Sequence, residues 1–153
     1  MSKLSDRFQK ENIIVNEPQI IIEDKSLTDD LLKKVNSVPY WNEYTIEQQR
    51  DMVRFFVKNS DTEDKETVYE ILIPYVTGFG ALQKLLDNEN VSAVFVNDDK
   101  SVHIEIDGNA YDAEMLLSEN MLQYILNYIK NLSADVYIID VKDDKSFMIR
   151  KTC

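Results

Sequence analysis

The glycines are the residues of this chain that could approach a phosphate most closely. A Walker-type loop needs the pattern Gly-x-x-x-x-Gly-Lys-[Ser/Thr], because its backbone N–H groups must cradle the phosphates. The chain has three glycines, Gly78, Gly80 and Gly108, and their spacing cannot form that loop. Gly78-Phe79-Gly80 also lacks the third glycine of a dinucleotide-binding turn and follows an expected helix, not a strand. We interpret this segment as the end of a helix.

Metal-binding and nucleophilic side chains are scarce. His103 is the only histidine, and it has no cysteine or second histidine nearby to complete a transition-metal site or a Ser-His-Asp arrangement. Asp98-Asp99-Lys100 and Asp143-Asp144-Lys145 contain calcium-type ligands, but the alternating ligand loop of an EF-hand is absent. Both segments are more typical of hairpin turns. We predict no catalytic residue, no metal ligand and no bound cofactor.

One enzymatic alternative stays open at the level of sequence. Carboxylates and tyrosines scattered along the chain could converge on a site that motif reading does not detect. Such a site would require a deep pocket with carboxylates whose pKa is shifted.

An aromatic group is the best candidate for a protein-interaction site. Tyr40, Trp41 and Tyr44 lie close together in the sequence, and Phe55 and Phe56 follow on the next expected helix. Aromatic side chains anchor many protein interfaces, but the same spacing is also typical of a hydrophobic core. We predict that Tyr40, Trp41 and Tyr44 contact a partner, together with the segment of Gly78, Phe79, Gly80 and Leu82.

Charge and composition limit the partners. The chain has 28 acidic and 17 basic residues among 153, which gives a formal net charge of −11. This charge repels nucleic-acid backbones and anionic lipid head groups, so we expect neither as a partner. The acidity could serve solubility alone, or it could favour a basic protein partner.

The compartment is suggested by cysteine content and hydropathy. Cys153 is the only cysteine, so no intramolecular disulfide can form, which favours the reducing cytoplasm. The N-terminal residues lack a signal-peptide core, and no apolar run is long enough to span a bilayer. We expect a cytoplasmic protein that reaches the inner membrane, if at all, through partners.

The first half of the chain is predicted to be helical. Residues 1–18 are polar and read as a flexible arm, and residues 19–23 could form a short strand. A helix capped at Ser26 or Thr28 should run to Asn36, and a second, capped by Thr45 with Gln48, should run to Lys58. In the second helix, Ile46, Val53, Phe56 and Val57 should face inward. A third helix should begin at Asp61 or Thr62 and end or kink at Pro74.

The second half is predicted to combine strands with two helices. A short helix over residues 81–86 precedes a buried strand over 91–96, and 102–106 alternates with the period of a strand before a turn at Asp107-Gly108 or Gly108-Asn109. A helix capped by Ser118 should run to Leu132 and cover the sheet. Its expected apolar stripe consists of Leu117, Met121, Ile125, Tyr128, Ile129 and Leu132. A second hairpin should join 136–141 to 147–150.

These elements predict an α+β fold. A helical N-terminal region should precede a mainly antiparallel sheet of hairpins, with a helix packed on one face. We divide the chain into a flexible arm (1–18), a helical N-terminal region (19–77) and an α+β domain (78–153).

Residues 78–108 also carry an ordered pattern that resembles a known family. The pattern is a Gly-x-Gly, a Leu-x-x-Leu-Leu, an Asp-rich turn, Val-Ser-x-Val-x-Val-Asn and Val-x-Ile-Glu-x-Asp-Gly. It is similar to the N-terminal domain of the bacterial type II and type IV secretion ATPases, including those of Flp/Tad pilus assembly. The matching residues, in register without a gap, are Gly78, Gly80, Leu82, Leu85, Leu86, Asp87, Val91, Ser92, Val94, Val96, Asn97, Val102, Ile104, Glu105, Asp107 and Gly108. A weaker likeness extends over residues 60–151.

This resemblance implies a non-catalytic domain of a ring-forming motor. In that family the domain packs on a separate ATP-hydrolysing domain, which this chain lacks, and its partners are other subunits of a secretion or pilus machine. In some relatives, arginines of the domain reach the nucleotide. The corresponding positions here are Ile106, Lys142 and Phe147, and Arg150 is the nearest arginine but out of register. The losses indicate either a domain that no longer contacts nucleotide or a divergent motor.

The leading hypothesis is therefore an assembly and interaction domain, and it requires the 91–96 and 102–106 strands to be adjacent. The alternative is a stand-alone acidic adaptor or inhibitor that binds a basic protein surface.

Overall fold

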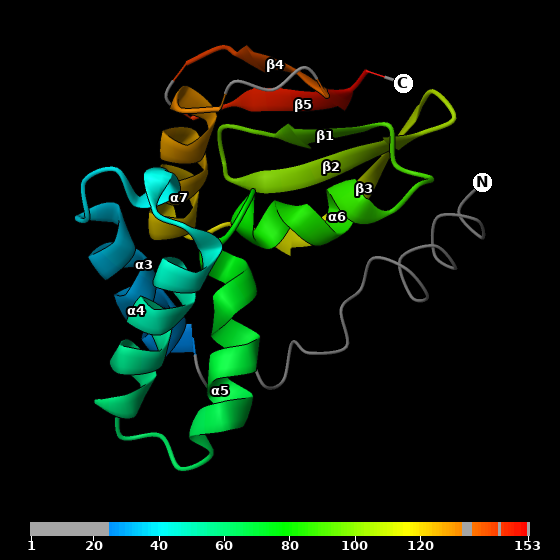
Figure 1. The fold of residues 1–153 in the computed structure, drawn as a ribbon. Helices are drawn as coiled ribbons and strands as arrows, with labels where there is room; N and C mark the ends of the chain where they lie inside the picture. The colour runs from blue at the N-terminus through cyan, green and yellow to red at the C-terminus, as the bar shows by residue number, and fades with distance from the viewer. Residues whose placement is uncertain (1–24, 133–135, 144, 153) are drawn as a thin grey trace.

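A computed structural model describes residues 25–132, 136–143 and 145–152 (Figure 1). The predicted arm over residues 1–18 and the predicted strand over 19–23 lie outside these ranges. Figure 1 shows a five-stranded sheet in the upper part of the molecule, with α3, α4 and α5 gathered below it to one side. The fold is α+β, as predicted.

The helical region begins with α3 (Lys25–Asn36), a short 3-10 turn η2 (Trp41–Glu43) and α4 (Ile46–Lys58). The predicted capping box of α4 is present: Gln48 N donates to Thr45 Oγ1, and Thr45 N donates to Gln48 Oε1. The inward face of α4 differs from the prediction at one position. Ile46 is 50% exposed because it is the first residue of the helix, whereas Gln49 is buried and its amide donates to the carbonyl oxygen of Trp41.

The next helix, α5 (Lys65–Leu72), starts later than predicted. Its N-cap is Asp64, whose carboxylate accepts from Thr67 N, and not Asp61 or Thr62. Lys65 Nζ donates to three carbonyl oxygens at the end of α4 and just after it, so the intervening residues are held as a connection. Pro74 lies within the 3-10 turn η3 (Ile73–Val76), which continues directly from α5.

The sheet has the strand order β3-β2-β1-β5-β4, and each neighbouring pair is antiparallel. After η4 (Gly80–Leu82) and α6 (Gln83–Asp87), the predicted hairpins form β1 (Ala93–Val96), β2 (Ser101–Ile106), β3 (Asn109–Leu116), β4 (Tyr137–Val141) and β5 (Phe147–Lys151). In β1 and β2, Val94 pairs with Ile104 and Val96 with Val102. The strands predicted over 91–96 and 102–106 are therefore adjacent, as the leading hypothesis requires.

One face of the sheet is buried and the other is not covered by the helices described. The buried side chains are those of Val94, Val96, Val102, Ile104, Phe147 and Ile149. On the opposite face, Phe95, His103 and Met148 are only half-buried. The alternation follows from the period of two along each strand.

Helix α7 (Glu119–Lys130) joins the two regions. Its predicted cap forms, since Met121 N donates to Ser118 Oγ. Met121 and Ile125 of the predicted stripe are buried, but α7 packs chiefly against α3, and Leu122 and Tyr124 are buried as well. The buried residues of α7, of the N-terminal helices and of the sheet belong to one hydrophobic cluster.

Candidate functional site

The aromatic turn around η2 divides into a buried and an exposed part. Trp41 is only 5% exposed; its Nε1 donates to the carbonyl oxygen of Val76 at 2.8 Å. Tyr40 is 72% exposed and Tyr44 is 38% exposed. Of the three predicted interaction residues, Tyr40 and Tyr44 are therefore accessible to a partner, while Trp41 is part of the core.

Tyr40 has an unusual backbone conformation. Its φ is 60°, in the left-handed region, and its carbonyl oxygen accepts from Glu43 N at 2.9 Å, which closes the turn into η2. A bulky residue seldom adopts this conformation, because its Cβ crowds the following carbonyl. The turn presents a large ring to solvent at a conformational cost.

The second predicted interaction segment is largely internal. Phe79, Gly80 and Leu82 are buried, so they cannot contact a partner directly in this structure. A Cβ on Gly80 would lie 2.8 Å from Met121 Sδ and 3.0 Å from the carbonyl oxygen of Tyr75. The segment therefore connects η3 to α6 and approaches α7 at a distance that only glycine permits.

Two aromatic contacts explain the burial of Phe79. Its ring packs edge-on against Tyr128 at 4.9 Å and against Tyr137 at 5.1 Å between centroids. The adjacent Gly78 is half-buried; its carbonyl oxygen accepts from Tyr124 Oη at 3.1 Å. Burial also raises the pKa of Tyr124, so its hydroxyl remains a donor at neutral pH. This hydrogen bond fixes the glycine turn against α7.

A small open cavity lies beside the aromatic turn. Its volume is about 210 Å³. Its walls come from the end of α3, the turn that follows, and one side of α7, and its lining residues are Val35, Asn36, Val38, Pro39, Tyr40, Trp41, Asn42, Tyr124, Asn127 and Asn131. Among the described residues, the lining contains four asparagines and no charged side chain. Sequence reasoning identified Tyr40 and Trp41 but missed the asparagines, which come from segments far apart in the chain.

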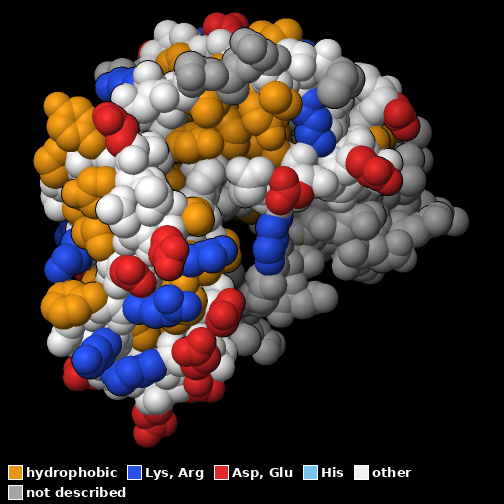
Figure 2. All heavy atoms as spheres, viewed as in Figure 1, with side chains coloured by type: hydrophobic (Ala, Val, Ile, Leu, Met, Phe, Trp, Pro, Cys, Tyr) orange, Lys and Arg blue, Asp and Glu red, His pale blue; other side chains and the backbone are white. Residues whose placement is uncertain are grey.

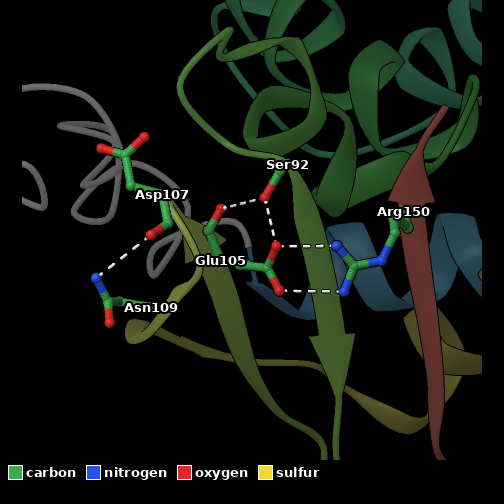
Figure 3. A network of polar contacts seen from close by, with 5 residues as sticks. All are labelled: Ser92, Glu105, Asp107, Asn109 and Arg150. Carbon is green, nitrogen blue, oxygen red and sulfur yellow. Dashed lines mark hydrogen bonds and ion pairs between the residues drawn. The ribbon is translucent and has the colours of Figure 1, made fainter. Parts of the chain in front are cut away.

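A second polar arrangement crosses the face of the sheet that the described helices do not cover (Figure 3). Arg150 on β5 donates to both carboxylate oxygens of Glu105 on β2, at 2.9 and 3.1 Å, and Ser92 Oγ donates to Glu105 at 2.8 Å. The hydrogen bonds from Arg150 and Ser92 lower the pKa of Glu105 below its ordinary value, and the carboxylate raises the pKa of Arg150. Glu105 is therefore ionised at neutral pH.

The ion pair is possible because the intervening strand carries a small residue. Ala93 on β1 is the register partner of both Glu105 and Arg150, so the three side chains lie in one row on the same face. Ala93 is fully buried although it lies on the uncovered face.

Other polar contacts lie beside this face and in the turns at its ends. Asn97 Nδ2 lies 2.9 Å from His103 Nδ1 and 3.1 Å from Ser101 Oγ, so His103 accepts a hydrogen bond there. Asp99 and Asp143 accept hydrogen bonds from residues two or three positions later, which lowers the pKa of both carboxyls. These carboxylates stabilise the two hairpin turns that the sequence predicted at Asp98-Asp99-Lys100 and Asp143-Asp144-Lys145.

Comparison with known proteins gives no assignment. No protein-family model matches this chain. A search of curated proteins finds no match either.

Residues 25–132, 136–143 and 145–152 contain no group of three His, Cys, Asp or Glu side chains arranged to hold a metal ion. None of the helices within those ranges has both the length and the apolar character needed to cross a bilayer. The carboxylates with a shifted pKa (Asp64, Asp99, Glu105 and Asp143) do not line the cavity described above.

Proposed function

We propose that this protein is a non-catalytic assembly and interaction domain of the kind that accompanies the ATP-hydrolysing domain in bacterial secretion and pilus-assembly ATPases. The observation that carries the proposal is the β1–β2 hairpin. The family-like pattern from Val91 to Gly108 spans this hairpin, and its two strands are adjacent, as the hypothesis requires. Without this adjacency the resemblance would have no structural counterpart.

The individual residues of the pattern support the same proposal. Its apolar members are buried, namely Leu82, Leu85, Leu86, Val91, Val94, Val96, Val102 and Ile104. Its glycines Gly78, Gly80 and Gly108 all have positive φ. The pattern thus describes a core and its turns, and the step from this fold to a shared function is an analogy.

The ion pair between Arg150 and Glu105 favours a domain without nucleotide contact over a divergent motor. A nucleotide-binding arginine must present its donors to phosphate. Two nitrogen atoms of Arg150 are already engaged by Glu105, and its side chain is 37% exposed. Recruiting this arginine to a phosphate would first require breaking a bidentate ion pair.

Partners and location follow from the same proposal. The partners would be other protein subunits of a secretion or pilus machine, and neither nucleic acid nor direct membrane insertion is expected. A cytoplasmic location, peripheral to the inner membrane through partners, is supported by the single cysteine of the chain.

The proposal is tested by mixing the purified chain with a separately purified ATPase domain that carries Gly-x-x-x-x-Gly-Lys-[Ser/Thr] and comes from the same genome. We expect a stoichiometric complex by size-exclusion chromatography with light scattering, and no ATP hydrolysis by the chain alone. A structurally intact chain that binds no such domain at about 100 µM, where even weak interfaces are populated, would refute the proposal. ATP hydrolysis by the chain alone would also contradict it.

The acidic-adaptor alternative is favoured by charge alone. The net charge is −11, and Asp61, Glu63 and Asp64 are exposed in the connection between α4 and α5. Figure 2 shows, however, that basic and acidic side chains are interspersed over the helical part of the visible face. If the alternative holds, binding to a basic partner should weaken steeply between low salt and about 0.5 M salt, because screening removes long-range attraction. Binding that resists salt would favour the assembly domain.

A further inference from the structure

The cavity beside Tyr40 lies at the carboxyl ends of two helices. Asn36 is the last residue of α3, and Asn131 is the C-cap residue of α7, and both line the cavity. The carboxyl end of a helix carries partial negative charge from its aligned peptide dipoles, although several of the last carbonyl oxygens of α3 and α7 accept capping hydrogen bonds. Two such ends at one cavity favour a cation.

The asparagine side chains add oxygen acceptors. Asn36 Nδ2 donates to the carbonyl oxygen of Asn120 at 3.0 Å, and Asn131 Nδ2 donates to that of Asn127 at 2.9 Å. Because only the nitrogen of an amide can donate, these bonds identify the remaining atom of each side chain as the acceptor Oδ1. Neither Oδ1 has a hydrogen-bond partner among the described residues. Both are available to a ligand that brings N–H donors.

Tyr40 supplies an aromatic surface. It lines the cavity and is 72% exposed, and its left-handed backbone holds the ring in the turn before η2. A cation within about 6 Å of a ring centroid is attracted to the face of the ring. A planar cation could therefore stack on Tyr40 and donate to the asparagine oxygens.

Other ligand classes fit less well. Mg²⁺ and Ca²⁺ prefer carboxylate ligands, and none of the described residues that line the cavity is charged. An anion would meet two negative helix ends and a chain with a net charge of −11. Three lysines lie in the last turns of the two helices, namely Lys33, Lys34 and Lys130. They are exposed and do not line the cavity, so they do not offset this repulsion of an anion there.

We propose that this cavity binds the guanidinium group of an arginine side chain from a partner protein. The inference rests on the proposed role in protein interaction, because it assigns the chemistry of the partner's anchoring residue. Arginine fits better than lysine, since its planar fork offers several donors and stacks on aromatic rings. The partner segment is thus basic at this contact, which also agrees with the acidity of the chain.

Trp41 provides a direct readout. It is the only tryptophan of the chain and lines the cavity, so its fluorescence should respond to an occupant. The probe is the capped peptide acetyl-Gly-Arg-Gly-amide, and its matched control replaces arginine with citrulline, which has nearly the same shape but no charge. We expect a saturable change with a dissociation constant on the order of 1 mM for the arginine peptide and none for the citrulline peptide.

Two variants test the charge and the stacking. Asn131→Asp places a negative charge at the cavity and should tighten binding of the arginine peptide about threefold to fivefold. Asn59→Asp is the matched control, because Asn59 is also an exposed C-cap residue whose amide donates to the carbonyl oxygen four positions earlier, but it does not line the cavity. It should leave the affinity unchanged. Tyr40→Gly removes the ring and should weaken binding.

Three results would overturn the inference. They are no saturable response to the arginine peptide up to about 20 mM, an equal response to the citrulline peptide, and weaker binding by Asn131→Asp. In each case the proposed assembly role could still hold, because the complex with an ATPase domain is measured separately. Conversely, if the peptide binds but the chain forms no complex with an ATPase domain, the cavity assignment stands and the assembly role is rejected.

Discussion

Breaking the ion pair across Ala93 should destabilise the sheet by a measurable amount. The perturbation is a double-mutant cycle of Glu105→Gln and Arg150→Met. Hydrogen bonds to charged groups contribute about 1.5–3 kcal/mol when well buried, whereas exposed ion pairs contribute about 0.2–1 kcal/mol. Here 37% of the Arg150 side chain and 20% of the Glu105 side chain are exposed, so solvent screens the pair. We expect a coupling free energy of about 1 kcal/mol at pH 7 and low salt.

The pH dependence has a definite sign. The pKa of Glu105 is lowered in the folded protein, chiefly by hydrogen bonding to Arg150. Between the folded pKa and the ordinary value of 4.5, the unfolded state therefore binds more protons. The coupling should be fully present above about pH 4.5 and should fall as the pH drops through the folded pKa.

The assay is urea unfolding of the parent and the three variants, followed by Trp41 fluorescence at pH 7 and at lower pH. The control cycle uses Lys100 and Glu119, a single contact of 3.3 Å whose glutamate is 75% exposed. Its coupling should be close to zero. The reasoning is refuted if the Glu105–Arg150 coupling does not exceed this control, or if it persists unchanged once Glu105 is protonated in the folded protein.

Ala93→Leu tests why the pair can form. A larger side chain would occupy the space that the bridge crosses, so the coupling between Glu105 and Arg150 should disappear in this background. Phe95→Leu is a matched change on the same face of β1, because Phe95 pairs with His103 and Met148 instead. The coupling should survive there, and its loss in both backgrounds would indicate a general disturbance of the sheet.

Three other changes should separate core from surface. Trp41→Ala should cost about 3–5 kcal/mol in unfolding free energy, because it empties a core site and removes the donor to Val76; a near-neutral result would show that the indole is not core. Gly80→Ala should cost at least 1 kcal/mol, since its φ is 58° and a Cβ would meet Met121 and Tyr75, while Gly108→Ala, with open space around it, should cost less. Tyr40→Gly should leave stability unchanged or raise it by up to about 1 kcal/mol, because glycine relieves the left-handed strain and little burial is lost; clear destabilisation would contradict that account. Urea titrations followed by far-UV circular dichroism measure all three effects, since this signal does not require Trp41.

Helix caps and turns formed by residues close together in the chain could be predicted from the sequence. The capping box of Thr45 and Gln48 and the cap at Ser118 involve residues three positions apart, so local sequence contains the whole interaction. The turn at Asp107-Gly108 and the alternation over β2 are local in the same sense. The prediction for α5 was wrong at its start: the sequence favoured Asp61 or Thr62, whereas the N-cap is Asp64, and Lys65 donates to carbonyl oxygens at the end of α4.

The tertiary structure alone decided which residues became accessible and which side chains met. The sequence determined the α+β elements, the hairpins and the acidic charge, because these follow from periodicity, turn residues and composition. It did not determine that Trp41 is buried while Tyr40 is exposed, since this depends on where Val76 and Gln49 lie in the fold. Nor could it pair Glu105 with Arg150, which are 45 positions apart and meet only because β5 pairs with β1. Contacts of this length depend on strand order, and strand order is set by how the whole core packs.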